Sequence, residues 1–198
     1  MRRLLGVDEP DFGHLLDDMV HRDAGPFPAA CVPAARYCLP RVEPEICFRL
    51  ARPLRGPDIT VEDVLHATDA VAPALEIVDS RIRDWKITLV DTVADNASSA
   101  GLVHGPWTPL ADVPDLAAVT TELLVDGEPV ASGSGREVLG HPAAAVAWLA
   151  NTLATFGTAL EPGQVVLPGA MTTAPSVRAG QRAEARFGGL GPVSVTFV

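Results

Sequence analysis

The sequence predicts a strand-rich α+β fold built as one domain, and three observations indicate this class. The chain has 198 residues, enough for one domain with a substantial core. Its 18 prolines and 17 glycines are dispersed, as expected of many turns and short strands. Most patterned segments alternate between apolar and polar residues, and the sequence has no internal repeat and no long linker. We therefore expect a single domain over residues 1–198.

The first forty residues are predicted to be mostly irregular. Residues 1–5 resemble the middle of a helix that lacks its beginning, and residues 6–13 are expected to form a loop. A short segment around Leu15 and Met19 follows. Residues 24–40 are rich in proline and alanine, which is typical of an irregular loop or of an edge strand.

The middle of the chain combines strands with one short helix. Strands are predicted at residues 41–50, 74–78 and 99–104. The helix is expected from residue 61 to about residue 70, because Thr60 and Asp63 match a capping pattern. Residues 81–98 are dense in polar groups interleaved with apolar ones, which favours a connection that lines a site.

The C-terminal part contains the clearest hairpin and the clearest helix. The hairpin spans residues 121–131 around an Asp-Gly pair, the favoured two-residue turn between twisted strands. The helix is predicted at residues 142–156, with Pro142 at its first position and a glycine after its end. Strands at residues 164–167, 183–187 and 193–198 are expected to finish the chain.

Charge and hydropathy argue against two classes of partner. The net charge is −10, Lys86 is the only lysine, and no basic cluster occurs, so nucleic acid and anionic membrane surfaces are not expected partners. No run of about 18 apolar residues occurs, so no membrane span is expected. The first five residues begin like a signal peptide, but acidic residues follow at once instead of an apolar segment.

Cysteine usage indicates a reducing compartment. The three cysteines are odd in number and have no Cys-x-x-Cys spacing; they are Cys31, Cys38 and Cys47. We expect free, mostly buried thiols in a cytoplasmic protein.

The strand at residues 41–50 carries the most informative polar pattern. Glu43 and Glu45 lie two positions apart, so their carboxylates project from the same face about 7 Å apart. One interpretation is a solvated face on which Arg41 and Arg49 form surface ion pairs. The other is a site for a hard divalent cation, which prefers carboxylate oxygens and relieves their mutual repulsion.

Longer motifs resemble a known family along nearly the whole chain. The matching stretches are residues 6–13 (GVDEPDFG), 40–46 (PRVEPEI), 73–86 (PALEIVDSRIRDWK), 91–99 (DTVADNASS), 138–142 (VLGHP), 147–150 (AWLA) and 189–191 (GLG). They are similar to the hydratase and decarboxylase branch of the fumarylacetoacetate hydrolase superfamily. The most similar group is the 2-keto-4-pentenoate hydratases of meta-cleavage pathways.

The resemblance implies a fold and an activity. The fold would be a mixed β-sandwich roll with short outer helices. The activity would be metal-dependent hydration of 2-hydroxypenta-2,4-dienoate to 4-hydroxy-2-oxopentanoate, in the catabolism of aromatic compounds or steroids. The alternatives are a 4-oxalocrotonate decarboxylase or a non-catalytic truncated homologue. A homo-oligomer is also implied.

The resemblance also implies site residues. Glu43, Glu45 and Glu76 would bind Mg²⁺ or Mn²⁺. Lys86 would line the metal pocket and stabilise negative charge, although a lysine is more often a solvated surface charge. Asp11 would take part in acid–base catalysis, or alternatively would cap a helix after Pro10.

Weaker indications concern the substrate and the N-terminus. Ser98 is a candidate for orienting the substrate. Residues 169–172 (GAMT) resemble a glycine–threonine turn of the family, which implies that their backbone N–H groups and Thr172 would hold the substrate carboxylate. His141 precedes Pro142, so capping of the helix competes with any chemical role. Relatives are expected to carry an additional N-terminal portion with an active-site lysine, which this sequence lacks.

Overall fold

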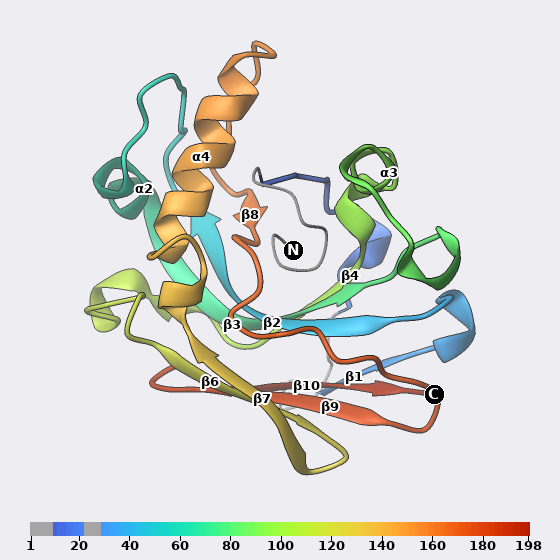
Figure 1. Cartoon of the computed structure of the whole chain (residues 1–198). Coiled ribbons are helices and arrows are strands. Elements are labelled where there is room, and N and C mark those ends of the chain that lie inside the picture. Colours follow the sequence, from blue (N-terminus) through green and yellow to red (C-terminus); the bar gives the residue numbers. More distant parts are fainter. Residues whose placement is uncertain (1–9, 22–28) are drawn as a thin grey trace.

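The computed structural model describes residues 10–21 and 29–198. Within these residues, ten strands form two five-stranded sheets that lie face to face (Figure 1). Sheet A consists of β4 (Ser99–His104), β3 (Thr68–Val78), β2 (Arg41–Leu50) and β8 (Val165–Val166) in that order, with β5 (Thr108–Pro109) paired to β3. Sheet B has the order β1 (Ala29–Val32), β10 (Gly191–Phe197), β9 (Arg182–Phe187), β6 (Thr120–Val125) and β7 (Glu128–Ser134).

Three α-helices and six short 3₁₀ helices complete the described fold. The α-helices are α2 (Val61–Ala67), α3 (Leu89–Ala94) and α4 (Pro142–Ala154). The 3₁₀ helices are η1 (Asp17–Met19), η2 (Ala34–Arg36), η3 (Arg83–Trp85), η4 (Asn96–Ser98), η5 (Leu110–Asp112) and η6 (Gly135–Glu137). Figure 1 shows the α-helices on the side of sheet A that faces away from sheet B, with α2 and α4 at one end and α3 at the other. The predicted strand-rich sandwich with short outer helices is confirmed.

The main core fills the space between the two sheets. Alternate residues of β2, including Val42, Ile46 and Phe48, are fully buried against apolar side chains of sheet B such as Val195 and Phe197. Each such side chain contributes roughly 1.5–3 kcal/mol through its burial. This alternation leaves the other set of β2 side chains on the opposite face of sheet A.

Strand register then determines which residues share that opposite face. β2 and β3 pair antiparallel, with Glu43 opposite Glu76 and Glu45 opposite Ala74. Beside them a second, smaller cluster contains the buried side chains of Cys47, Ala72, Ala74 and Leu102. The three glutamates therefore belong to a face of small apolar residues instead of a polar surface.

The helix termini show why the helices begin where the sequence predicts. The Thr60 and Asp63 side chains each bond to the other's backbone N–H at the start of α2. The ring of His141 accepts a hydrogen bond from the N–H of Ala143 at the start of α4, so the capping interpretation of His141 is confirmed. In contrast, α2 ends at Ala67 and not near residue 70, because β3 begins at Thr68 and pairs with β2 over ten positions.

The remaining elements agree with most of the sequence predictions. The hairpin of β6 and β7 turns at Asp126 and Gly127, which both have positive φ, at 53° and 86°. The proline- and alanine-rich segment contains β1, an edge strand of sheet B. Residues 1–9 and 22–28 lie outside the described part, so the helix expected at residues 1–5 is not assessed.

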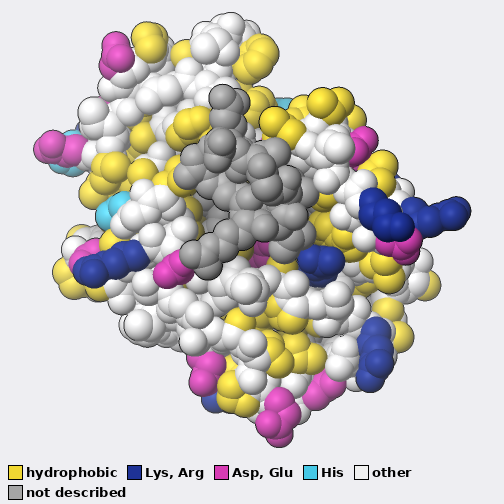
Figure 2. All heavy atoms as spheres, in the orientation of Figure 1, with side chains coloured by type: hydrophobic (Ala, Val, Ile, Leu, Met, Phe, Trp, Pro, Cys, Tyr) yellow, Lys and Arg dark blue, Asp and Glu magenta, His cyan; other side chains and the backbone are white. Residues whose placement is uncertain are grey.

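One prediction about the cysteines is wrong. Cys47 is buried, but Cys31 and Cys38 are exposed, because they belong to the edge segment that precedes β2. All three thiols are free. Figure 2 shows lysine and arginine side chains scattered over the face viewed, without a gathered basic patch. No helix among the described residues is long and apolar enough to cross a membrane.

Candidate metal centre

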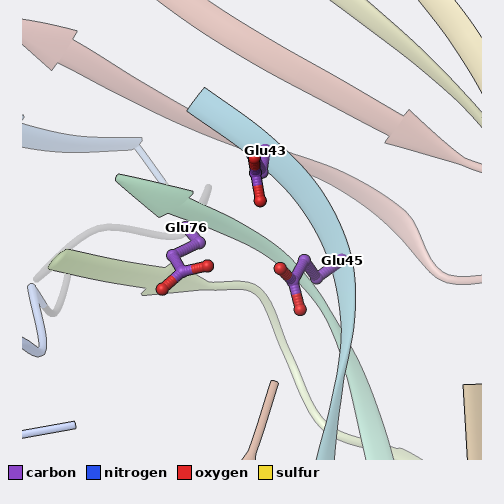
Figure 3. Close-up of side chains that lie close together, drawn as sticks. All are labelled: Glu43, Glu45 and Glu76. Atoms are coloured by element: carbon purple, nitrogen blue, oxygen red, sulfur yellow. The ribbon is translucent and has the colours of Figure 1, made fainter. Parts of the chain in front are cut away.

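Three carboxylates converge on the outer face of sheet A. Glu43 and Glu45 come from β2 and Glu76 comes from β3, and Figure 3 shows their side chains directed into one common space. One carboxylate oxygen from each lies within 4.8 Å of the others. Glu43 is 6% exposed and Glu45 is 1% exposed. The structure therefore brings together the three glutamates that the family resemblance implies as metal ligands, from two strands that are separated along the chain.

The alternative interpretation of this strand as a solvated face is wrong, because Glu43 and Glu45 are buried, although Arg49 does form a surface ion pair. Arg49 forms its ion pair with Asp69, at 2.7 Å between Nη2 and Oδ2. The guanidinium of Arg41 lies over the ring of Trp85, 4.4 Å from its centroid. Neither arginine neutralises Glu43 or Glu45 by an ion pair within the described residues.

The electrostatics of the cluster favour a bound cation. Burial, together with the charges of Glu76 and Glu43, raises the pKa of Glu45 well above its usual range. Burial is also the main cause that raises the pKa of Glu43, and burial with the charge of Glu43 raises the pKa of Glu76 to about 8. Without a cation, the cluster must therefore hold protons near neutral pH.

The hydrogen bonds of the cluster do not replace that cation. The N–H of Gly169 donates to Oε2 of Glu45 at 2.7 Å, a bond that favours the charged carboxylate. Within the described part of the chain, no lysine or arginine forms an ion pair with any of the three glutamates. Two buried carboxylates and one half-buried carboxylate, all with raised pKa values, fit a hard divalent ion, which selects oxygen ligands.

A large cavity opens above the carboxylates. Its volume is about 1460 Å³, more than a five-carbon acid requires. The glutamates lie among its lining residues, together with residues of α4, the segment at residues 10–17 and the turn at residues 167–174. The structure thus brings Asp11 and Thr172 to the same cavity as the carboxylate cluster.

Asp11 contacts helix α3, which is distant from it along the sequence. Its Oδ2 accepts a hydrogen bond from the Thr92 hydroxyl of α3 at 3.0 Å. The interpretation of Asp11 as a helix cap is wrong, because residues 10–16 contain no helix. Asp11 is held at the cavity by a tertiary contact, which the local sequence pattern does not reveal.

Lys86 is not among the described lining residues of the cavity. Its side chain is 80% exposed, and its Nζ lies 3.6 Å from Oδ2 of Asp84. It follows η3, in which Asp84 and Trp85 have positive φ values. This geometry agrees with a solvated surface charge and gives no support to the expected position in the metal pocket.

Three smaller candidates have different surroundings. The Ser98 hydroxyl is buried and has no hydrogen-bond partner among the described residues, whereas the following residue, Ser99, lines the cavity. Thr172 lines the cavity, and its hydroxyl donates to the carbonyl of Thr173 at 2.8 Å. The N–H of Gly169, expected to hold a substrate carboxylate, bonds to Glu45 instead.

Comparison with known proteins identifies the class. Residues 19–198 match the family described as fumarylacetoacetate (FAA) hydrolase C-terminal. The chain therefore belongs to the fumarylacetoacetate hydrolase family, as the sequence motifs predicted.

Individual relatives are similar to the chain over nearly its whole length. The chain is 46% identical over 194 residues to 2-hydroxyhexa-2,4-dienoate hydratase of Comamonas testosteroni, covering 98% of this chain and 72% of the relative. It is 45% identical over 198 residues to 2-keto-4-pentenoate hydratase of Paraburkholderia xenovorans (strain LB400), covering 100% of this chain and 71% of the relative. It is also similar to 4-oxalocrotonate decarboxylase from Pseudomonas putida G7, solved with magnesium and adipate. That structure has a TM-score of 0.93 and 35% identity, covering 100% of this chain and 73% of the solved one.

Proposed function

We propose that this chain is a divalent-metal-dependent hydratase of 2-hydroxydienoates. It would convert 2-hydroxypenta-2,4-dienoate and water to 4-hydroxy-2-oxopentanoate, with residues 1–198 acting as one catalytic domain. The observation that carries the proposal is the cluster of two buried glutamates, Glu43 and Glu45, with the half-buried Glu76 at a large cavity. The identity of 46% and 45% to two proteins named as hydratases supports the reaction.

Glu43, Glu45 and Glu76 would hold Mg²⁺ or Mn²⁺. Their oxygen-only ligand set and their raised pKa values support this choice, and a related structure was solved with magnesium. A bound ion would supply positive charge at the cavity and would thereby favour the enolate form of the substrate. β2 and β3, which carry the three glutamates, form the floor of the cavity.

Asp11 is the candidate base for the addition of water. In the reaction, the enol loses its O–H proton as carbon 5 gains one, which gives an α,β-unsaturated ketone. Water then adds as hydroxyl to carbon 4 and as a proton to carbon 3, so that one water is consumed. Because the Thr92 hydroxyl donates to Oδ2 of Asp11, we assign Oδ1 as the atom that takes the proton from water.

Thr172 and Ser98 are proposed to orient the substrate. Thr172 lines the cavity on the turn that begins with Gly169, next to Glu45. Ser98 does not line the cavity itself, so its buried hydroxyl, which has no partner in the described residues, would act through a water molecule or through the neighbouring Ser99, which does line it. The role expected for Lys86 in charge stabilisation has no such support from the geometry.

Decarboxylation of 4-oxalocrotonate is the second candidate function. The structural similarity to 4-oxalocrotonate decarboxylase, with a TM-score of 0.93, favours it. We prefer the hydratase because the relatives named as hydratases are more similar in sequence, at 46% and 45% identity against 35%. The segment RIRDWK at residues 81–86 also resembles the hydratase form of that motif.

The experiment follows the ultraviolet absorbance of 2-hydroxypenta-2,4-dienoate with the purified chain, in Mn²⁺ or Mg²⁺ and in chelator. Metal-dependent loss of absorbance with formation of 4-hydroxy-2-oxopentanoate is expected. A parallel sample receives 4-oxalocrotonate and is assayed for CO₂. Release of CO₂ without hydration would replace the hydratase by the decarboxylase. No turnover of either substrate by folded protein that binds Mn²⁺ would favour a non-catalytic homologue.

Location and assembly form the last part of the proposal. We propose a cytoplasmic homo-oligomer. Three free thiols support a reducing compartment. The exposed side chains of Val90 and Val93, one turn apart on α3, are 77% and 55% exposed in the isolated chain and support burial against another copy. Light scattering of the purified chain tests the assembly.

A further inference from the structure

Two segments of the cavity wall are joined by three side-chain hydrogen bonds. The Thr92 hydroxyl donates to Oδ2 of Asp11 at 3.0 Å. The amide of Asn96 accepts from the N–H of His14 at 2.7 Å and donates to the carbonyl of His14 at 2.9 Å. The bonds cross 81 and 82 positions of the sequence, so they fix segments that the backbone does not connect locally.

The backbone of both segments is shaped for this contact. Asn96, Ala97 and Ser98 have φ values of 56°, 56° and 58°, a left-handed turn that is unfavourable for residues other than glycine. Asparagine tolerates this conformation better than most residues. On the other side, Gly13 lies so close to the Asn96 carbonyl that a Cβ at this position would overlap it. Unfavourable conformations of this kind persist where surrounding contacts require them.

The Thr92 side chain has little freedom to point elsewhere. It is fully buried within α3, and the Thr88–Asp91 capping box fixes the start of that helix. Asp11 lines the cavity, as does Ala97 in the left-handed turn. The α3–η4 unit thus holds Asp11 from behind while the carboxylate borders the cavity.

We propose that Thr92 and Asn96 are positioning residues, whose hydrogen bonds to Asp11 and His14 hold the Asp11 carboxylate in its orientation for water addition. This inference rests on the proposed hydratase function. Thr92 acts on the carboxylate directly, whereas Asn96 fixes the backbone that carries it. Neither residue needs to touch the substrate or the metal ion.

The first test replaces Thr92 by valine, which has a similar shape but no hydroxyl. We expect kcat to fall about 10- to 100-fold, because a small displacement of a catalytic group costs rate of this order. KM and the affinity for Mn²⁺, measured by titration, should change less than about threefold. Thr92→Ser, which retains a hydroxyl donor, should recover most of the activity.

A matched control separates positioning from general loss of a buried hydroxyl. Thr121 is also a buried threonine, and its hydroxyl has no hydrogen-bond partner in the described residues. Thr121→Val is expected to leave kcat unchanged. Asn96→Gly tests the second contact, since glycine accepts the left-handed turn while removing both bonds to His14. It should also lower kcat with little change in Mn²⁺ affinity.

A double-mutant cycle decides whether Thr92 acts through Asp11. In an Asp11→Asn background, Thr92→Val should cause almost no further loss of kcat. Full additivity, wild-type activity of Thr92→Val, or failure of serine to restore activity would each overturn the inference. A wild-type chain without hydratase activity would instead overturn the proposed function, so the two failures are distinguishable.

Discussion

The floor and the wall of the cavity are built on different principles. The floor carries Glu43, Glu45 and Glu76 on β2 and β3, whose register fixes ten residue pairs by backbone hydrogen bonds. The wall carries Asp11 in a segment without regular secondary structure, held by individual side-chain bonds to α3 and η4. The geometry of the three glutamates on the floor therefore depends on the sheet, whereas the orientation of Asp11 on the wall depends on single contacts.

The largest expected effect comes from altering the floor. Glu45→Gln removes one of the three carboxylates proposed to bind the metal ion, while the amide oxygen can still accept from the N–H of Gly169. Mn²⁺ affinity should fall by at least about 100-fold, because even residues that only support a ligand contribute about 10- to 100-fold. Hydratase activity should be abolished, as measured by the ultraviolet assay at saturating substrate.

The same substitution should stabilise the metal-free protein. At pH 8, removal of one buried, mutually repelling carboxylate should raise the free energy of unfolding by on the order of 1–3 kcal/mol. Urea denaturation with chelator measures this difference. Glu122→Gln on β6 is the matched control, because Glu122 is an exposed strand glutamate of sheet B and should change neither property. A less stable metal-free Glu45→Gln would contradict this account of the floor.

A second, smaller effect concerns pH. The folded protein raises the pKa of Glu43, Glu45 and Glu76 above the ordinary value of 4.5, for Glu76 to about 8. Between these pH values the folded state binds more protons than the unfolded state, so metal-free stability must fall as pH rises. From pH 5 to pH 8.5 we expect a loss on the order of a few kcal/mol.

The measurement compares wild type with Glu45→Gln over that pH range, since contributions from other titrating groups cancel in the difference. Saturating Mn²⁺ should remove most of the loss, because the ion binds the folded state and displaces the protons. Identical pH profiles for the two metal-free proteins would show that the carboxylates do not interact as the structure indicates.

The smallest effect is expected at Lys86. Its exposed side chain and its contact with Asp84 at 3.6 Å place it outside both the floor and the wall. Lys86→Ala should change kcat and KM by less than about twofold. It should change the free energy of unfolding by less than about 0.5 kcal/mol. A loss of kcat above about tenfold would restore the charge-stabilising role that the family resemblance implied.

The contrast also explains what the sequence alone can predict. Strand periodicity identified β2 and placed Glu43 and Glu45 on one face, because a period of two residues is a local property. Glu76 required the family resemblance, since its position opposite Glu43 depends on strand pairing. The sequence predicts only residues 74–78 of β3 as a strand. Pairing with β2 extends the strand back to Thr68, into residues that the sequence predicts as the end of a helix.

On the wall, local patterns were less informative. The proline before Asp11 suggested a helix cap, but a hydroxyl more than eighty positions away determines its surroundings. Thr92 was not singled out, although it lies in the DTVADNASS motif, because a threonine in a short helix carries no local signal of a tertiary bond. Contacts of this kind require the three-dimensional arrangement.

The pairing of β1 with β10 bears on how the protein is made in the cell. Residues 29–32 lie parallel to residues 194–197, so this edge of sheet B forms only after the C-terminal strand has been synthesised. β2 and β3, in contrast, are consecutive strands joined by residues 51–67, which include α2, and they can pair while the ribosome is still extending the chain. A nascent chain that stops before β10 would carry the carboxylate floor, but sheet B would lack the strand between β1 and β9. The apolar side chains of sheet A that pack against β10 would then be uncovered, and exposed apolar surface of this kind is what chaperones recognise.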